Sequence, residues 1–489
     1  PGPRMRPAVA PLRPAFACLL LATTVLAGCS QGPSSPVAVS APDVVLHSSF
    51  GDKAVAAREG LPPVVRFADV HTGYPGGEPN IGVTPSGTVF ATAYETIVRS
   101  VDGGRSFQPS YRQRLGFTND PMLWVDEQTG RVFSPQQFPK ELCSSQVFSD
   151  DEGRTWLEKP LTCGIPLVDH QKIASGPHTG PLAGAGVLHP RLVSYCYNKP
   201  HVGTHCAVSH DGGVTFSLDR LIDPVPGSRV PAGELPPCGG LNGHQRHGHD
   251  GTIVLPYGYE CKRARAAVST DGGLTWTLRD LGERNRELDP EVASTPDGTW
   301  YYLYRGDDNL PYLLRSRDRF ATTEGPFAVA PPGIAGTMFL GLVAGSDGRI
   351  AVSYLANTRS SLGPDDVPRD TAWHLYVGFS LNADARVPTF LTSRVNPEED
   401  PVQRGTICMD KPCLQDPGAS TTNRNLLDFI DMAVAPDGRV YVAYADGCTS
   451  RACLAPDASP RSSRSDELTV AWVLEGPGLF GPDVKPPPR

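Results

Sequence analysis

Short apolar segments separated by turn residues run through most of the 489-residue chain. A typical unit has a polar start, an apolar stretch, a glycine turn and a second stretch rich in β-branched and aromatic residues, as in residues 78–83 followed by 87–94. Apolar runs of this length between turns predict β-strands. Units of this kind begin about every 58 residues, at Glu78, Asp120, Asp169, Leu241, Asp289, Thr337 and Leu427.

Each unit has room for four strands, which is the content of one propeller blade. We therefore predict an all-β fold, a single β-propeller of four-stranded blades over residues 62–476, with seven blades favoured and six as the alternative. The last unit shows three strands and ends at 467–472. The early segment 63–67 can supply its fourth strand, which closes the ring and removes an exposed sheet edge. The 51 glycines and 50 prolines agree with a turn-rich chain and argue against a helical bundle.

An eight-residue pattern, Ser-x-Asp-x-Gly-x-(Ser/Thr)-aromatic, begins at Ser100, Ser149, Ser209 and Ser269, with a degenerate copy at Ser316. Ser and Asp side chains bond nearby backbone N–H groups in tight turns, and glycine supplies positive φ. The pattern resembles the Asp-box of the sialidase-like, or bacterial neuraminidase repeat, β-propellers. With the segments at 169–171, 238–244 and 424–428, the chain resembles exported actinobacterial propellers described as exo-α-sialidase-like. The resemblance implies a fold marker rather than a catalytic element.

The first residues have the layout of an export signal. Arginines precede an apolar run at 15–27 that is too short for an ordinary membrane anchor. The run ends in Leu26-Ala27-Gly28-Cys29, which resembles the lipobox of bacterial lipoproteins. We expect a signal peptide over 1–29 with lipidation at Cys29, a flexible tether over 30–61 and a Pro-rich tail over 477–489. The protein is then a lipoprotein on the outer face of the cell membrane, with ordinary secretion as the alternative.

Ten cysteines remain after Cys18 and Cys29, and an exported chain favours disulfides. Neighbours in sequence suggest five local pairs: Cys143/Cys163, Cys196/Cys206, Cys238/Cys261, Cys408/Cys413 and Cys448/Cys453. The net charge of −8 gives no general attraction to nucleic acid. We expect no nucleic-acid partner, no cofactor, and a monomer, because a closed ring leaves no free edge.

The polar starts of the units converge on one end of a propeller axis, where propeller ligands bind. We predict a site there for an extracellular glycan or glycoprotein. The catalytic candidates are Glu78, Asp120, Asp289, Glu291 and Tyr354. The substrate-binding candidates are Asn80, Asp169, His170, Gln171, Asn242, His244, Arg305, Arg424 and Asp428.

Two other functions stay open beside glycoside hydrolysis. The family resemblance implies three substrate-binding arginines, a Tyr nucleophile activated by a Glu, and an Asp acid/base. The segment that matches the first arginine motif is Glu78-Pro79-Asn80-Ile81, which has no arginine. A non-catalytic propeller that binds carbohydrate or protein at the cell surface is therefore an alternative. A metal site on the axis is the third, with O and N ligands from Asp120, Asp169, His170, His244 and Asp428.

Overall fold

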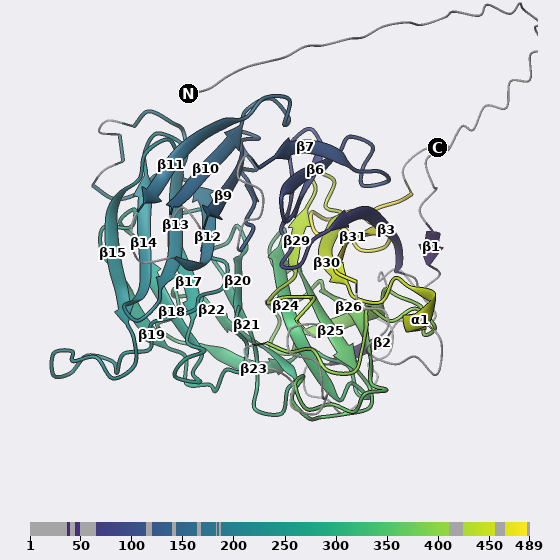
Figure 1. Cartoon of the computed structure of the whole chain (residues 1–489). Coiled ribbons are helices and arrows are strands. Elements are labelled where there is room, and N and C mark those ends of the chain that lie inside the picture. Colours follow the sequence, from purple (N-terminus) through teal and green to yellow (C-terminus); the bar gives the residue numbers. More distant parts are fainter. Residues whose placement is uncertain are drawn as a thin grey trace, which may run out of the picture. The chain divides into compact units, whose positions relative to one another are not determined.

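A computed structural model gives the fold of residues 37–39, 45–48, 65–113, 120–138, 143–163, 168–181, 183–184, 187–409, 424–454 and 465–486. These residues belong to one compact unit, Pro36–Arg489. They are almost entirely β-strand, and α1 (Arg451–Leu454) is a single turn of helix (Figure 1). The predicted signal peptide and Cys29 lie outside the described residues. Within the described ranges, no helix is long and apolar enough to cross a membrane.

The strands form seven antiparallel four-stranded blades (Figure 1). The first three blades are β4 (Ile81–Val83), β5 (Val89–Ala93), β6 (Thr96–Ser100) and β7 (Gln108–Arg112); β8 (Trp124–Val125), β9 (Val132–Phe138), β10 (Cys143–Ser149) and β11 (Leu157–Cys163); and β12 (Asp169–Gly176), β13 (Leu192–Lys199), β14 (Gly203–Ser209) and β15 (Ser217–Pro224). The next three are β16 (Arg246–His247), β17 (Ile253–Tyr257), β18 (Arg265–Ser269) and β19 (Thr277–Asp280); β20 (Glu291–Ser294), β21 (Trp300–Arg305), β22 (Pro311–Ser316) and β23 (Glu324–Ala328); and β24 (Gly336–Ala344), β25 (Ile350–Asn357), β26 (Ala372–Ser380) and β27 (Thr389–Arg394). The last is β29 (Asp431–Val434), β30 (Val440–Asp446), β31 (Glu467–Glu475) and β3 (Arg66–Pro75). The short strand β28 (Gln403–Arg404) pairs with β26.

The innermost strands make a closed ring. They contact one another in the order β4, β8, β12, β16, β20, β24 and β29, and β29 contacts β4 again. The prediction of seven blades is confirmed, and the six-blade alternative is wrong. Bulky side chains such as Trp300, Trp373 and Trp472 are buried between blades, so the core is distributed around the ring.

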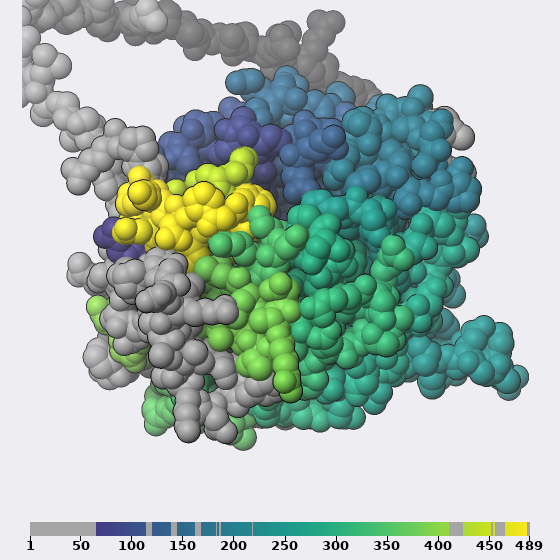
Figure 2. All heavy atoms as spheres, turned by 180° about the vertical axis from the view of Figure 1, so that it is seen from behind, coloured from purple at the N-terminus to yellow at the C-terminus, as the bar shows by residue number. Residues whose placement is uncertain are grey.

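The ring is closed by the strand expected from the sequence. The N-terminal strand β3 pairs along β31, with Arg66 opposite Glu475 and Val70 opposite Val470. Figure 2 shows the C-terminal residues (yellow) against the start of the chain (purple). Two short strands, β1 (Val37–Val39) and β2 (Val45–Ser48), fall inside the segment expected as a tether and pair with β3 and β27. The tail also packs on the ring, since Leu479 and Val484 are buried.

The repeated eight-residue pattern forms a hairpin between the third and fourth strands of a blade. In the first copy, Ser100 Oγ accepts a bond from Gly104 N (2.8 Å), and Asp102 Oδ1 accepts bonds from the N–H groups of Arg105 and Ser106. The copies at Ser149, Ser209 and Ser269 repeat these contacts. The degenerate copy does the same, although Phe320 replaces the glycine and takes φ +61°.

The hairpins define one end of the ring, which we call the hairpin end. The turns between the first and second strands lie there too, since Arg319 of one hairpin bonds Asp250 of such a turn at 2.9 Å. The first strand of every blade therefore starts at the opposite end, which we call the mouth end. Trp156, which ends the second copy of the pattern, packs against Phe90 of the preceding blade. The hairpins thus hold neighbouring blades together, as the sequence indicates.

Candidate functional site

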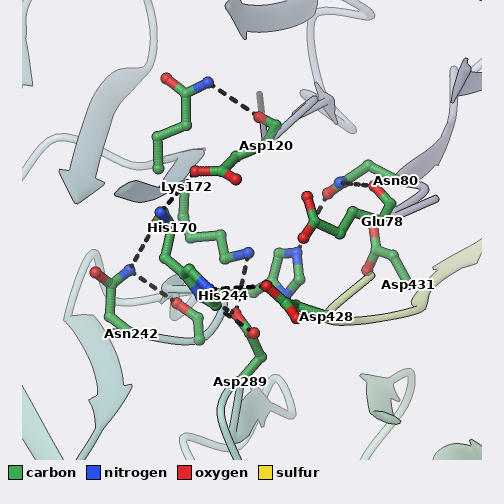
Figure 3. Close-up of polar contacts among 12 residues, drawn as sticks. Glu78, Asn80, Asp120, His170, Lys172, Asn242, His244, Asp289, Asp428 and Asp431 are labelled. Atoms are coloured by element: carbon green, nitrogen blue, oxygen red, sulfur yellow. Dashed lines mark hydrogen bonds and ion pairs between the residues drawn. The ribbon is translucent and has the colours of Figure 1, made fainter. Parts of the chain in front are cut away.

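Ionisable and amide side chains from the starts of the first strands meet on the axis (Figure 3). We call this set the axial cluster; its members are Glu78, Asn80, Asp120, His170, Lys172, Asn242, His244, Asp289, Glu291 and Asp428. Three of them have positive φ: Glu78 at +52°, Asp120 at +44° and His170 at +47°. Non-glycine residues rarely adopt this conformation, and it is concentrated at functional sites. The positive φ of His170 coincides with a register shift in β12 between Asp169 and Lys172. The side chain of His170 points toward the axis (Figure 3).

Asp289 is the ionic centre of the cluster. Its carboxylate lies 3.0 Å from Lys172 Nζ and 3.2 Å from His170 Nδ1, and all three side chains are almost fully buried. Lys172 Nζ also lies 3.6 Å from the centre of the Phe429 ring. Burial raises the pKa of Asp289, but the two cations outweigh burial and hold it below its usual value. Burial lowers the pKa of His170, but Asp289 and Asp428 outweigh it and raise it well above its usual value.

A second buried pair lies beside this centre. His244 Nδ1 bonds Glu291 Oε1 at 2.5 Å, and His244 Nε2 lies 3.2 Å from Asn80 Oδ1. Burial, together with the charges of Lys172 and Arg246, lowers the pKa of His244 well below its usual value. Burial raises the pKa of Glu291 well above its usual value. The pair therefore shares one proton and carries no net charge at neutral pH.

Three carboxyl groups toward the mouth have different pKa values. Burial, and then the charge of Asp428, raises the pKa of Glu78 well above its usual value. Burial raises the pKa of Asp120 to about 6. For Asp428, burial is outweighed by His170 and by Arg424, whose Nη2 lies 2.6 Å from Oδ2, and its pKa falls to about 2. The mouth thus holds Glu78, whose surroundings favour the protonated form, beside Asp428, whose surroundings favour the carboxylate.

Amide side chains fix the chain around these acids. Asp120 Oδ2 accepts bonds from His170 N (2.9 Å) and Gln137 Nε2 (3.1 Å), and Gln171 Nε2 donates to the Asp120 carbonyl. Asn242 Nδ2 donates to the His170 carbonyl at 3.3 Å. A Cβ on Gly243 would lie 1.8 Å from the carbonyl oxygen of Pro290, so glycine lets this segment approach the next blade. The Asn-Gly-His sequence at 242–244 is thereby explained.

Nine of the predicted residues belong to the cluster, and Gln171 and Arg424 contact its members Asp120 and Asp428. The other three, Tyr354, Arg305 and Asp169, lie apart from it. Tyr354 is fully buried, and its ring stacks on Tyr376 at 6.0 Å within the core, so it is removed from the catalytic candidates. Arg305 is buried and bound to Glu287 at 3.0 Å. Asp169 is half-buried at the rim, next to His170. Sequence reasoning missed Lys172 and Phe429, because a lysine in the largely polar strand Asp169–Gly176 carries no signal of its own.

The metal alternative receives no support. Among the residues that the structure describes, no group of three or more His, Cys, Asp and Glu side chains could hold a metal ion. In the axial cluster the histidines and acids pair with one another, with Lys172 or with Arg424.

Three predicted disulfides are confirmed: Cys196–Cys206, Cys238–Cys261 and Cys448–Cys453. The backbones of Cys143 and Cys163 are register partners on β10 and β11, and their pairing stays a prediction. Cys413 lies outside the described residues, so the Cys408/Cys413 pair stays a prediction too. The bonds at 238–261 and 448–453 tie loops at the mouth end, which restricts the segments around the axis.

No protein-family model matches the chain, and no curated protein matches it significantly in sequence. Solved structures are similar in fold. A protein of unknown function from Dyadobacter fermentans aligns with 85% of this chain and 99% of its own, at 15% identity and a TM-score of 0.43. A leech intramolecular trans-sialidase aligns over 82% and 68%, at 14% identity and a TM-score of 0.42. A GH74 enzyme from Niastella koreensis aligns over 78% and 53%, at 16% identity and a TM-score of 0.45, so this chain spans about half of that enzyme. The proposal for the function of this chain therefore rests on its axial cluster.

Proposed function

We propose that the protein is an exported propeller that hydrolyses glycosides at the mouth end of its axis, held at the outer face of the cell membrane by a lipid on Cys29. Glu78 is the proton donor to the leaving oxygen, and Asp120 is the base that activates water. The observation that carries the proposal is the contrast between neighbouring carboxyl groups: Glu78 is buried, whereas Asp428 is held by His170 and Arg424. Glycoside hydrolysis needs one carboxyl group that keeps its proton and one carboxylate, and such a contrast favours this difference.

The surrounding charges support these roles. Asp428 stays ionised because His170 and Arg424 pair with it, and its negative charge keeps the proton on Glu78. The base role suits Asp120, because its pKa of about 6 makes it a carboxylate at neutral pH that can still accept a proton. Asp120 and Arg424 are partly exposed, so the cluster reaches the surface of the mouth end.

The arginines favour a neutral sugar over a sialoside. Recognition of a sugar carboxylate needs guanidinium groups that are available to it. Arg305 is bound to Glu287, and Arg424 to Asp428. Arg246 lines a cavity at the hairpin end of the axis and not the mouth. A sialic acid would have to displace Asp428 to reach Arg424.

The test is hydrolysis of a panel of fluorogenic glycosides, an α-sialoside included, by the full chain carrying Cys29→Ser. Glu78→Gln and Asp120→Asn should each lower kcat/KM by about 10²- to 10⁴-fold, the usual contribution of a general acid or base. The matched control is Asp69→Asn. Asp69 is a carboxyl that burial likewise brings to a pKa of about 6, but it is bonded to Tyr444 in the closing blade. The control should retain activity.

Turnover that survives both substitutions at the axial cluster contradicts the proposal. Binding of glycans without turnover of any glycoside favours the non-catalytic propeller. The anchoring part has its own test, since Cys29→Ser should move the exported protein from the membrane fraction to the soluble fraction.

A further inference from the structure

A cavity lies on the axis at the hairpin end, on the far side of the axial cluster from the mouth. Its volume is about 230 Å³, and residues from all seven innermost strands line it. Residues of the first-to-second-strand turns, such as Glu127 and His249, and the partly exposed Phe480 of the tail lie among its lining residues. Apolar cavities of about 150 Å³ bind benzene, so there is room for a larger ligand.

Aliphatic side chains make up part of the walls of the cavity, and polar groups make up about as much. Val83, Leu342 and Val434 contribute apolar side chains from three different blades. Ala433 and Val434 are only partly buried although they lie within the ring, so their accessible surface belongs to the cavity. Such walls favour the hydrocarbon part of a ligand, because its burial removes apolar surface from water.

One guanidinium group lies among these walls. The charged end of Arg246 lies 5.2 Å from the ring of Trp124, and its side chain is 13% exposed. Within the described part of the chain it donates one hydrogen bond, from Nη1 to the Gln245 carbonyl. Its Nη2 lies 3.6 Å from Asp431 and 3.8 Å from Glu291, which is beyond hydrogen-bond distance.

The nearby carboxyl groups are engaged with other donors. Asp431 accepts bonds from the N–H groups of Ile81 and Met432, and Glu291 bonds His244. Burial raises the pKa of Glu291 well above its usual value, so this neighbour adds little negative charge beside Arg246. The guanidinium therefore keeps N–H groups available to an anion, while Asp431 stays within ion-pair distance of it.

We propose that this cavity binds a small organic acid, a carboxylate on an aromatic or aliphatic body, with the carboxylate paired to Arg246. A guanidinium group can bond both carboxylate oxygens, and the aliphatic part of the walls takes the body. This site is separate from the mouth, because the axial cluster lies between the two. It is independent of the proposed hydrolysis.

Calorimetric titration of the full chain with 1-naphthoate tests the proposal, with neutral 1-naphthamide as the matched ligand. The carboxylate should bind at least about 10-fold more tightly than the amide, because bonds to charged groups are the stronger ones. Arg246→Met should weaken naphthoate binding by about 10- to 100-fold. Ala433→Leu places extra carbons in the cavity without touching the ion pairs and should weaken both ligands.

Three results overturn the proposal. One is no naphthoate binding by the wild-type protein. Another is equal binding of acid and amide, which removes the anion preference. The third is unchanged naphthoate binding by Ala433→Leu, which places the ligand elsewhere. The acid-against-amide comparison needs only wild-type protein, so the proposal stays testable if a variant fails to fold.

Discussion

Replacing Asp289 by asparagine removes the one negative charge that both His170 and Lys172 contact. His170 keeps Asp428 at 3.6 Å, but Lys172, which is fully buried, keeps only the Phe429 ring among the residues that the structure describes. Removing one partner of a buried ion pair costs about 3–5 kcal/mol, because the other charge stays buried without compensation. We expect Asp289→Asn to lower the free energy of unfolding by that amount.

The loss should depend on pH in a defined direction. The folded pKa of His170 is raised, so its contribution to stability is complete below its unfolded value and is lost as pH rises through the folded value. The folded pKa of Asp289 is lowered, so its contribution is complete above its unfolded value and is lost as pH falls. The difference between wild type and variant should therefore be largest between about pH 4 and 6.5, the two unfolded values.

Chemical denaturation at several pH values, with the disulfides intact, measures this difference. Glu291→Gln is the matched control, since Glu291 is equally buried but held protonated, and its replacement should cost less than about 1 kcal/mol. If Asp289→Asn costs no more than Glu291→Gln, the ion pairs around Asp289 do not stabilise the ring and the reasoning fails.

Three further predictions concern the activity and the framework. The glycosidase rate should rise with pH through about 6 as Asp120 ionises and fall at higher pH as Glu78 loses its proton, and a rate indifferent to pH between 5 and 7 would count against Asp120 as the base. Asp102→Ala removes an acceptor of two backbone bonds and should destabilise the first hairpin by about 1–2 kcal/mol, measured by denaturation against Arg105→Ala as the control. The double variant Cys196→Ser/Cys206→Ser opens a loop with a sequence separation of 10 and should lower unfolding free energy by about 2–3 kcal/mol; an unchanged denaturation midpoint would show that the bond adds nothing.

The repeat in the sequence was sufficient to predict the blades and the way they close. Each blade reuses one arrangement of strands and turns, so a local pattern found several times determines the architecture. Arg66 and Phe67 of the segment expected at 63–67 lie beside the last strand as predicted, and β3 extends further, to Pro75. Strands β1 and β2 were missed because their short apolar runs lie among residues typical of a tether.

The sequence predicted where the site lies, but not which of its side chains pair with one another. Glu78, Asp120 and His170 begin different units, and the ring symmetry alone brings them to one axis. Which of these side chains contact one another depends on positive φ angles and a strand bulge. Neither feature can be predicted from the residue types at these positions. Tyr354 ends a second strand as the sequence suggested, but its ring turns into the core. Lys172 was missed because a single cation in a strand carries no signal without its partner 117 positions later.

The pairing of β3 with β31 also determines how the ring responds to mechanical force. The first residue of β3, Arg66, is the register partner of the last residue of β31, Glu475. The start of β3 and the end of β31 therefore lie at the same edge of the blade. Tension applied between Arg66 and Glu475 therefore opens the backbone hydrogen bonds one after another instead of shearing them all together. The closing blade should be the first to yield, and the six remaining blades keep their own strands when it does.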